Sequence, residues 1–325
     1  MADRTGGVNM RKKIEMNKSK QNKTFGEGFE EFVLYCKSKN LRKTTIKHYH
    51  DIAHIICKFL PPSTPLNTIT KKTIEQFIIH LKNNTKQNEV SINSTIISTR
   101  AIMYFFMKLG YIEEFKIPKI KTDKPVIETY TDEELELLLK KPDLHKCSFL
   151  EYRNWVIINF LLATGCRART LCNLKIKDLD FENDLIKYDW TKNRRQQIVP
   201  MSKSLKRILI EYIGYREGEA DDYLFVNAYG NYLKVVQLSH NIIDYNARRG
   251  VVKRGVHRFR HTFAKLWILN GGDIFRLQKM LGHSSMDMVR NYVDMFTNDL
   301  QKDFDTYNPL EQLKTGNKNH ISMRR

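Results

Sequence analysis

Four short stretches in the second half of the chain concentrate side chains that bind phosphate or transfer protons. Arginine and lysine hold phosphate oxygens through charge-assisted hydrogen bonds, and imidazole exchanges a proton near neutral pH. A phenol close to such groups could take part in chemistry instead of packing. The candidates are Arg167 in ATGCRARTLCNL, Lys192 in WTKNRRQQ, His257 and Arg260 in HRFRH, and His283 and Tyr292 in LGHSSMDMVRNY.

The local pattern indicates where these side chains stand. Arg167 follows a Thr-Gly break between two predicted helices, where a charged side chain is available to a ligand. His257 and Arg260 are three residues apart and therefore share one face of a helix, with His261 beside them. Taken singly, each has an ordinary explanation: a solvated or phosphate-contacting cation, a histidine at a helix C-terminus or, for Tyr292, core packing. Only their combination favours a reaction.

The composition indicates a polyanionic partner. The chain has 325 residues, enough for two domains, and its 55 Lys and Arg against 36 Asp and Glu give a net charge of +19. Its hydrophobic content of 41% is compatible with folded domains. Nucleic acid is the usual partner of such an excess, and an anionic membrane is the competitor. The sequence shows no basic amphipathic helix, membrane-spanning run or signal peptide, and its five cysteines form no CxxC. We therefore expect a cytoplasmic nucleic-acid binder.

Periodicity divides the chain into five segments. Residues 1–24 are basic and lack periodicity, so we expect a flexible tail. Residues 25–115 show about four helical patterns and no strand signal. Residues 116–129 are a basic linker, residues 130–304 return to folded structure, and residues 305–325 form a C-terminal tail.

The segment 130–304 is predicted to be mostly helical with a small antiparallel sheet. Thr131 and Glu134 form a capping box ahead of a helix, and an apolar helix spans about Tyr152 to Thr164. Three strand candidates follow, NLKIKDLDF, LIKYDW and QQIVPM, and the last two flank the turn TKNRR as a hairpin that carries Lys192 at its tip. Five further helical stretches complete the segment.

Five of these elements occur in the order and with the spacing of one family. T-G-x-R, a hairpin lysine, H-x-x-R-H, L-G-H-S-S and a tyrosine nine residues beyond that histidine resemble the catalytic domain of the tyrosine recombinases, or phage-integrase family. The words IVPM, RHTFA and LGHSS match as well. The resemblance covers about residues 25–300, and the helical segment in front is similar to the SAM-like core-binding domain of Xer-type members.

The resemblance implies transfer of DNA strands through a pentacoordinate phosphorus. Arg167 and Arg260 would hold the non-bridging oxygens in the geometry that guanidinium groups favour. His257 and His283 would donate to the phosphate or shuttle a proton. The guanidinium pair would replace the divalent metals of two-metal nucleases, so neither a metal nor a cofactor is implied.

The resemblance also implies a nucleophile and an acid. Tyr292 would attack the phosphorus, because a phenol with a pKa near ~10 is activated by neighbouring cations and leaves readily when the strand rejoins. Lys192 would protonate the departing 5′ oxygen from a flexible hairpin able to reach the minor groove. The phosphotyrosine bond would conserve the energy of the broken strand, and the chain contains no G-x-x-x-x-G-K-[ST] motif for ATP.

Some positions depart from the family pattern. Thr170 stands where the family usually has an acidic residue, and Met288 and Val289 replace two frequent threonines before the tyrosine. Lys192 lacks neighbouring glycines and is followed by two arginines that offer competing cations. None of these changes removes a proposed catalytic group.

A metal-ligand spacing in the first half has a simpler explanation. His50 and His54 are four residues apart in HYHDIAH, but no glutamate or cysteine partner follows at motif distance. We expect exposed, DNA-facing histidines and no metal site.

The sequence therefore predicts a mainly α protein: a helical core-binding domain and an α+β catalytic domain with a small antiparallel sheet. Its predicted function is site-specific recombination of double-stranded DNA, in integration or excision of a mobile element or in resolution. We expect a monomer in solution and a homotetramer in the synaptic complex, with residues 305–325 docking in cis or on a neighbouring protomer. The alternatives are DNA relaxation of the type IB topoisomerase kind and an inactive DNA-binding relative.

Overall fold

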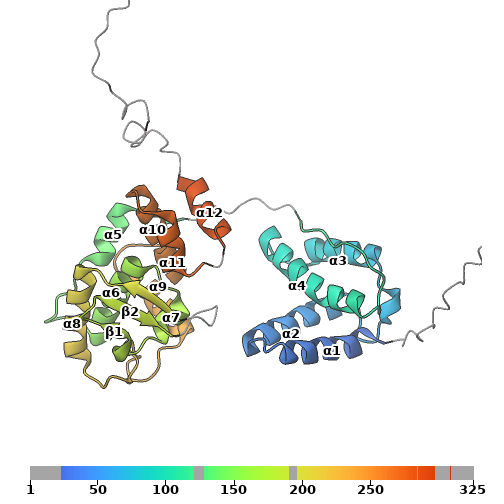
Figure 1. The fold of residues 1–325 in the computed structure, drawn as a ribbon, viewed down its shortest axis with the longest axis horizontal. Helices are drawn as coiled ribbons and strands as arrows, with labels where there is room; N and C mark the ends of the chain where they lie inside the picture. Colours follow the sequence, from blue (N-terminus) through green and yellow to red (C-terminus); the bar gives the residue numbers. More distant parts are fainter. Residues whose placement is uncertain (1–22, 121–127, 190–195, 284, 297–307, 309–325) are drawn as a thin grey trace, which may run out of the picture. The chain divides into compact units, whose positions relative to one another are not determined.

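The chain forms two compact units, Met1–Lys124 and Pro125–Arg325. The computed structural model describes residues 23–120, 128–189, 196–283, 285–296 and 308 (Figure 1). Lys192 lies outside the described residues, as does all of the predicted C-terminal tail except Asn308. Each unit has its own hydrophobic core.

Among its described residues, the first unit is a bundle of α-helices. The elements are α1 (Phe25–Ser38), α2 (Lys43–Cys57), the short 3-10 helix η1 (Leu66–Thr68), α3 (Lys71–Asn84) and α4 (Glu89–Lys108). Helix α1 begins at a capping box, in which the Thr24 hydroxyl accepts a hydrogen bond from the Glu27 amide and the Glu27 carboxylate accepts one from the Thr24 amide. The four helices predicted from periodicity are confirmed.

The core of the first unit uses the helix faces that the sequence pattern indicates. Phe29, Phe32 and Cys36 of α1 are buried, as the spacing predicts. Gly28 lets α1 approach η1 and α4 closely, because a Cβ there would lie 2.7 Å from the Leu66 side chain and 3.0 Å from the Phe106 ring. Ile117, beyond the end of α4, is also buried in this core. Part of the predicted linker therefore packs on the helical bundle.

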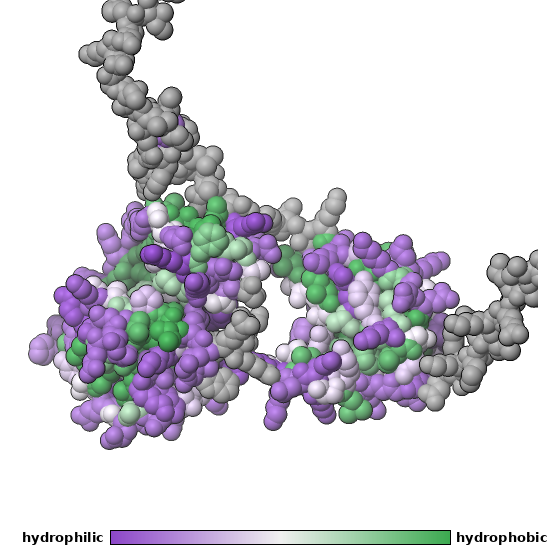
Figure 2. Space-filling view, viewed as in Figure 1, coloured by the Kyte–Doolittle hydropathy of each residue, from purple (hydrophilic) through white to green (hydrophobic). Residues whose placement is uncertain are grey.

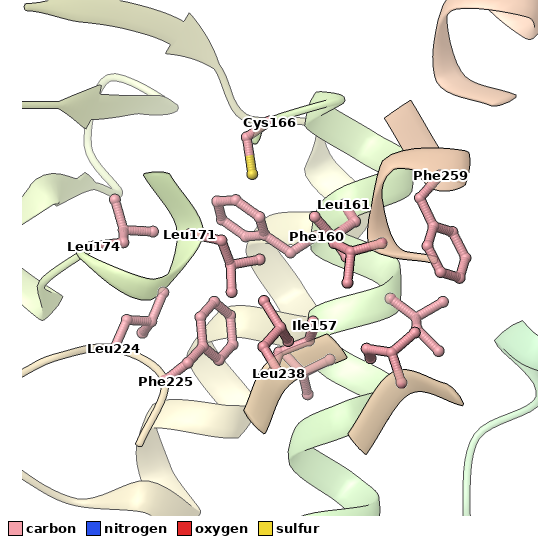
Figure 3. Close-up of a cluster of buried hydrophobic side chains, with 14 of the residues drawn as sticks. Ile157, Phe160, Leu161, Cys166, Leu171, Leu174, Leu224, Phe225, Leu238 and Phe259 are labelled. Atoms are coloured by element: carbon pink, nitrogen blue, oxygen red, sulfur yellow. The ribbon is translucent and has the colours of Figure 1, made fainter. Parts of the chain in front are cut away.

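The second unit surrounds one central helix. Its elements are α5 (Asp132–Leu139), α6 (Phe149–Thr164), α7 (Ala168–Cys172), η2 (Ile176–Asp178), β1 (Leu179–Asp180), β2 (Leu185–Tyr188), β3 (Gln197–Pro200), α8 (Lys203–Arg216), α9 (Val235–Arg248), α10 (Val256–Leu269), α11 (Ile274–Leu281) and α12 (Asp287–Phe296). Helix α6 is apolar nearly all round and is packed against α5, α8, α9 and α10. Figure 3 shows Ile157 and Phe160 of α6 in one buried cluster with Phe225 and Leu238.

The described strands form a three-stranded antiparallel sheet in the order β1-β2-β3. Ile186 of β2 pairs with Val199 of β3, so the predicted hairpin is confirmed. The candidate NLKIKDLDF is mostly not a strand: Lys175 forms an isolated bridge with Tyr223, η2 follows, and only Leu179–Asp180 joins the sheet. The Asp178 carboxylate accepts a hydrogen bond from the Lys175 amide at 2.8 Å and closes a 3-10 turn, and the Ile176 and Lys177 amides donate to the carbonyls of residues 222 and 220 instead of to a strand.

The predicted fold class, mainly helical with a small antiparallel sheet, is confirmed. The visible surface of each unit is largely hydrophilic, with small hydrophobic patches (Figure 2). None of the described helices is both long and apolar enough to cross a membrane.

Candidate active site

Arg167 stands at a sharp turn between α6 and α7. Gly165 ends α6 in the left-handed conformation at φ 60°, and Arg167 is the N-cap of α7. A Cβ on Gly165 would lie 2.5 Å from Cδ1 of Phe263 and 2.8 Å from Cδ2 of Leu281, so both the conformation and the space require glycine. The Arg167 side chain is half-buried, and its Nη2 donates a long hydrogen bond of 3.5 Å to the Gly282 carbonyl.

Arg260 lies on α10 and is buried, with 4% of its surface exposed. Its Nη1 donates to the Gly165 carbonyl at 2.8 Å, and its Nη2 donates to the Leu281 carbonyl at 2.7 Å. These two bonds join the end of α6 to the end of α11 through one guanidinium. The side chain is therefore a structural clamp as well as a candidate phosphate ligand.

Among the described residues, no acid group compensates the positive charge of this pair. No ion pair of Arg260 or Arg167 with a described carboxylate is present. Burial and then the charge of Arg167 lower the pKa of Arg260 to about 10, and burial also lowers the pKa of Arg167. Since buried charges are costly unless paired, this pair would be stabilised by a bound anion.

His283 follows directly after the left-handed Gly282 that ends α11. Its Nε2 lies 2.8 Å from Nη2 of Arg260, and because arginine only donates, Nε2 accepts and the ring proton is on Nδ1. Nδ1 is buried and has no hydrogen-bond partner among the described residues. Burial and the charges of Arg260 and Arg167 lower the pKa of His283 to about 4. The neutral ring thus contacts the Arg260 guanidinium through Nε2 and leaves a buried Nδ1–H without a partner among the described residues.

His257 occupies the first turn of α10, one turn before Arg260. Its side chain is exposed, yet partial desolvation at the site and the charges of Arg260 and Arg167 lower its pKa. It is therefore near both guanidiniums and is neutral at pH 7.

Tyr292 lies on α12 and is almost completely buried, with 3% of its surface exposed. It packs with Val289, Leu277 and Leu281, and its ring is parallel to that of His283 at a centroid distance of 6.3 Å. Its hydroxyl lies 2.8 Å from Nδ1 of His261. Burial raises the pKa of Tyr292, and the charge of Arg260 opposes that rise.

The structure thus brings together five of the six residues selected from the sequence, and Lys192 lies outside the described residues. Two further residues belong to the site. His261 was noted only as a neighbour within the H-x-x-R-H motif. The Gln197 side chain donates to the Lys279 and Met280 carbonyls at 2.7 Å each and so ties β3 to α11, and no sequence signal indicates this.

The arrangement combines an anion-binding pair, a neutral imidazole and a phenol. In the described part of the chain, no group of three or more His, Cys, Asp or Glu side chains is placed to hold a metal ion. The two guanidiniums can supply hydrogen bonds to the oxygens of a phosphate.

Sequence comparison identifies the protein family that the chain matches. The pattern of the phage integrase family matches residues 128–299, and that of the phage integrase SAM-like domain matches residues 24–122. A tyrosine recombinase of Pseudothermotoga lettingae is 26% identical over 295 residues, covering 88% of this chain and 98% of that protein. A probable integrase/recombinase of Acholeplasma phage L2 is 30% identical and covers 80% of this chain and 90% of that protein.

Solved structures share the fold. The Tn1549 transposon integrase in complex with a circular intermediate DNA has a TM-score of 0.70 at 20% identity, over 83% of this chain and 95% of that chain. A lambda integrase tetramer bound to a Holliday junction has a TM-score of 0.69 at 17% identity, over 86% of this chain and 80% of that chain. The family, fold class and enzyme type predicted from the motifs are confirmed. The chain belongs to the phage integrase family, the tyrosine recombinases.

Proposed function

We propose that this chain is a site-specific recombinase that cuts and rejoins DNA strands through a 3′-phosphotyrosine link at Tyr292. The observation that carries the proposal is the pair Arg167 and Arg260, whose charges no described carboxylate compensates and which meet beside His283 and Tyr292. A scissile phosphate supplies the anion that this pair lacks.

The donors of the site suit a pentacoordinate phosphorus, in which charge builds up on the non-bridging oxygens. Arg260 has five N–H donors and uses three for Gly165, Leu281 and His283 among the described residues, and its guanidinium also interacts with the Tyr292 hydroxyl. His283 accepts a hydrogen bond from Nη2 of Arg260 through its Nε2 and so helps to orient the guanidinium. Because the backbone carbonyls hold Arg260 in place, these donors are oriented before the substrate arrives, which is the condition for strong electrostatic stabilisation.

The remaining roles follow from the family to which the chain belongs. Tyr292 attacks the phosphorus, Lys192 protonates the departing 5′ oxygen, and His257 assists at the phosphate. The free 5′ hydroxyl of a partner strand then attacks the phosphotyrosine and releases Tyr292. Each step breaks one phosphate ester bond and forms another, so the cycle needs no external energy source.

We further propose double-stranded DNA with specific recombination sites as the partner. The net charge of +19 supports this, and the relatives include integrases solved on a circular intermediate DNA and on a Holliday junction. The SAM-like segment 25–115 would contact the DNA together with the catalytic segment 130–304, joined by residues 116–129. Four protomers would act in the synaptic complex, and the free protein would be a monomer.

The biological role we favour is integration or excision of a mobile element. Relatives from a phage and a transposon support it, whereas the Xer recombinases among the relatives are compatible with resolution. Terminal or direct repeats in the DNA beside the gene would identify a mobile element, and their absence would favour resolution.

The test is covalent trapping on a duplex that is nicked beside the cleavage position and built from the DNA that flanks the gene. The wild-type chain should give an SDS-resistant complex, because the short strand beyond the nick diffuses away and prevents rejoining. Tyr292→Phe should bind this DNA as tightly as the wild type but form no complex. The variant loses only the hydroxyl and keeps the ring that packs on Val289 and Leu277. An adduct with Tyr292→Phe would assign the nucleophile to another residue.

A further inference from the structure

The hydroxyl of Tyr292 is hydrogen-bonded to a histidine that the proposed mechanism leaves without a role. The Tyr292 oxygen lies 2.8 Å from Nδ1 of His261, and the two ring centroids are 5.6 Å apart at an angle of 49°. Because only 3% of Tyr292 is exposed, water has little access to its ring. The phenolic proton is therefore oriented by the protein and not by solvent.

The surroundings of His261 and Tyr292 keep both side chains in their neutral forms. Burial and the charges of His257, Arg260 and Arg258 lower the pKa of His261 to about 4, so its ring is neutral at pH 7. Burial raises the pKa of Tyr292, so its phenol keeps the proton. A neutral imidazole has one nitrogen with a free lone pair, and in the tautomer that carries its proton on Nε2 the Nδ1 atom accepts the phenolic hydrogen bond. The charged and titratable groups that face His261 are His257, Arg258 and Arg260 on α10, His283 after α11, and Tyr292 on α12.

We propose that His261 is a further catalytic residue, the group that accepts the phenolic proton when Tyr292 attacks a DNA phosphate; this rests on the recombinase function proposed above. The proton passes from the Tyr292 oxygen to Nδ1 of His261. That oxygen bonds to phosphorus, and the bond from phosphorus to the 5′ oxygen breaks. The 5′ oxygen takes up a proton from the acid of the mechanism or from water. On rejoining, the imidazolium returns its proton to the departing phenolate.

In this geometry His261 can act as a general base only when DNA is bound. An imidazole whose conjugate acid has a pKa of about 4 is too weak to deprotonate a phenol in the DNA-free protein. A phosphate bound by Arg167 and Arg260 brings a negative charge next to the cations that depress the pKa of His261. The pKa of His261 therefore rises when DNA binds, and proton transfer becomes favourable only with a substrate in place.

His257 is the competing proton acceptor, because it is also neutral and close to both guanidiniums. It lies one turn before His261 on α10 and is exposed, whereas the Tyr292 hydroxyl lies 2.8 Å from Nδ1 of His261. His257 thus remains a phosphate ligand in the proposed mechanism.

The test compares His261→Asn with His240→Asn, a change of an exposed histidine on α9 outside the site. Asparagine keeps a hydrogen-bonding group close to the position of Nδ1 but cannot take up a proton. Single-turnover formation of the covalent complex is measured on the nicked flanking DNA between pH 5.5 and 9. We expect His261→Asn to be slower by on the order of 10²-fold at pH 7, and its rate to rise about tenfold per pH unit because the phenol must ionise to solvent. The wild type and His240→Asn should depend on pH much less steeply.

Two results would overturn the assignment: a rate of His261→Asn within about threefold of the wild type, or a slower rate with the wild-type pH profile, which would make His261 only a positioning residue. DNA binding and thermal melting of the variant verify that it folds. If it does not fold, His261→Ala is assayed with added imidazole, which should restore adduct formation several-fold, and absence of rescue overturns the proposal. A wild type without adduct would refute the recombinase function itself, independently of His261.

Discussion

At the scale of single residues, the two arginines of the site have the same proposed catalytic role but contribute differently to the stability of the fold. Arg260 is buried and bonds two backbone carbonyls, whereas Arg167 is half-buried and makes one long bond to Gly282. The loss of each should therefore affect catalysis alike and stability differently.

Arg260→Ala and Arg167→Ala should each slow single-turnover cleavage by on the order of 10²-fold or more, as expected for the loss of a preorganised donor. Only Arg260→Ala should also lower the free energy of unfolding, by on the order of 3 kcal/mol, because it leaves the buried carbonyls of Gly165 and Leu281 without a donor. In a unit of this size that is a fall in melting temperature of about 6–12 °C.

The control is Arg248→Ala, a change of an exposed arginine on α9 that should alter neither quantity. DNA affinity should change little in all three variants, since many other cations hold the phosphate backbone. Cleavage by either site variant within a few-fold of the wild type would remove that arginine from the phosphate clamp. Equal melting temperatures for the two site variants would contradict the structural duty of Arg260.

The site residues were predictable because their types and order are a property of the sequence. The motif series selected Arg167, His257, Arg260 and His283 with no knowledge of the fold, and the structure places them together. The bond from His261 to Tyr292 was not predictable, because it joins residues 31 positions apart and depends on how α12 packs on α10. Sequence spacing carries no information on that packing.

At the scale of elements, the sequence predicted best those helices and strands whose stabilising contacts lie within a few residues. The capping box of Thr131 and Glu134 starts α5 as expected, because both partners lie within one turn. Helix α6 begins at Phe149, earlier than the predicted Tyr152, since the Ser148 hydroxyl accepts a hydrogen bond from the Glu151 amide. The prediction from apolar residues missed the Ser148 N-cap, which sets the start of the helix. The strand predicted around η2 failed because its backbone bonds to residues 220 and 222, far away in sequence.

The turn that ends α6 gives a prediction at this scale. Gly165→Ala should lower the free energy of unfolding by on the order of 3 kcal/mol, because alanine is strained at φ 60° and its Cβ collides with Phe263 and Leu281. Cleavage should fall as well, since the Gly165 carbonyl holds Arg260. Chemical denaturation and single-turnover cleavage measure the two effects.

Gly250→Ala is the matched control for that turn. Its φ is 78°, but a Cβ there would meet nothing within 4 Å, so it should cost only about 1 kcal/mol of backbone strain. If the two variants were equally stable, the close approach of α10 and α11 to the turn would not contribute to stability.

At the scale of the whole molecule, the two units have separate cores, and no hydrophobic cluster of described residues spans both. We therefore expect the fragments 1–124 and 125–325 to fold independently, each with a cooperative melting transition and the helical circular dichroism of its half of the chain. A fragment that aggregates or melts without cooperativity would show that its core depends on the other unit.

Because the two units have separate cores and the chain is strongly basic, we expect each unit to contribute its own phosphate contacts to DNA binding. The logarithm of the DNA-binding constant should fall linearly with the logarithm of the salt concentration, with a slope of about −0.9 for each phosphate contacted. If both units contact the duplex, the slope for the full chain should be steeper than that for residues 125–325 by several units, the difference being the phosphates bound by residues 1–124. Fluorescence anisotropy of one labelled duplex between about 50 and 300 mM salt measures both slopes. Mutating Tyr292 to Phe in both proteins keeps the equilibrium free of covalent capture. Equal slopes would mean that the helical unit does not neutralise phosphates, and its role would then lie in contacts between protomers.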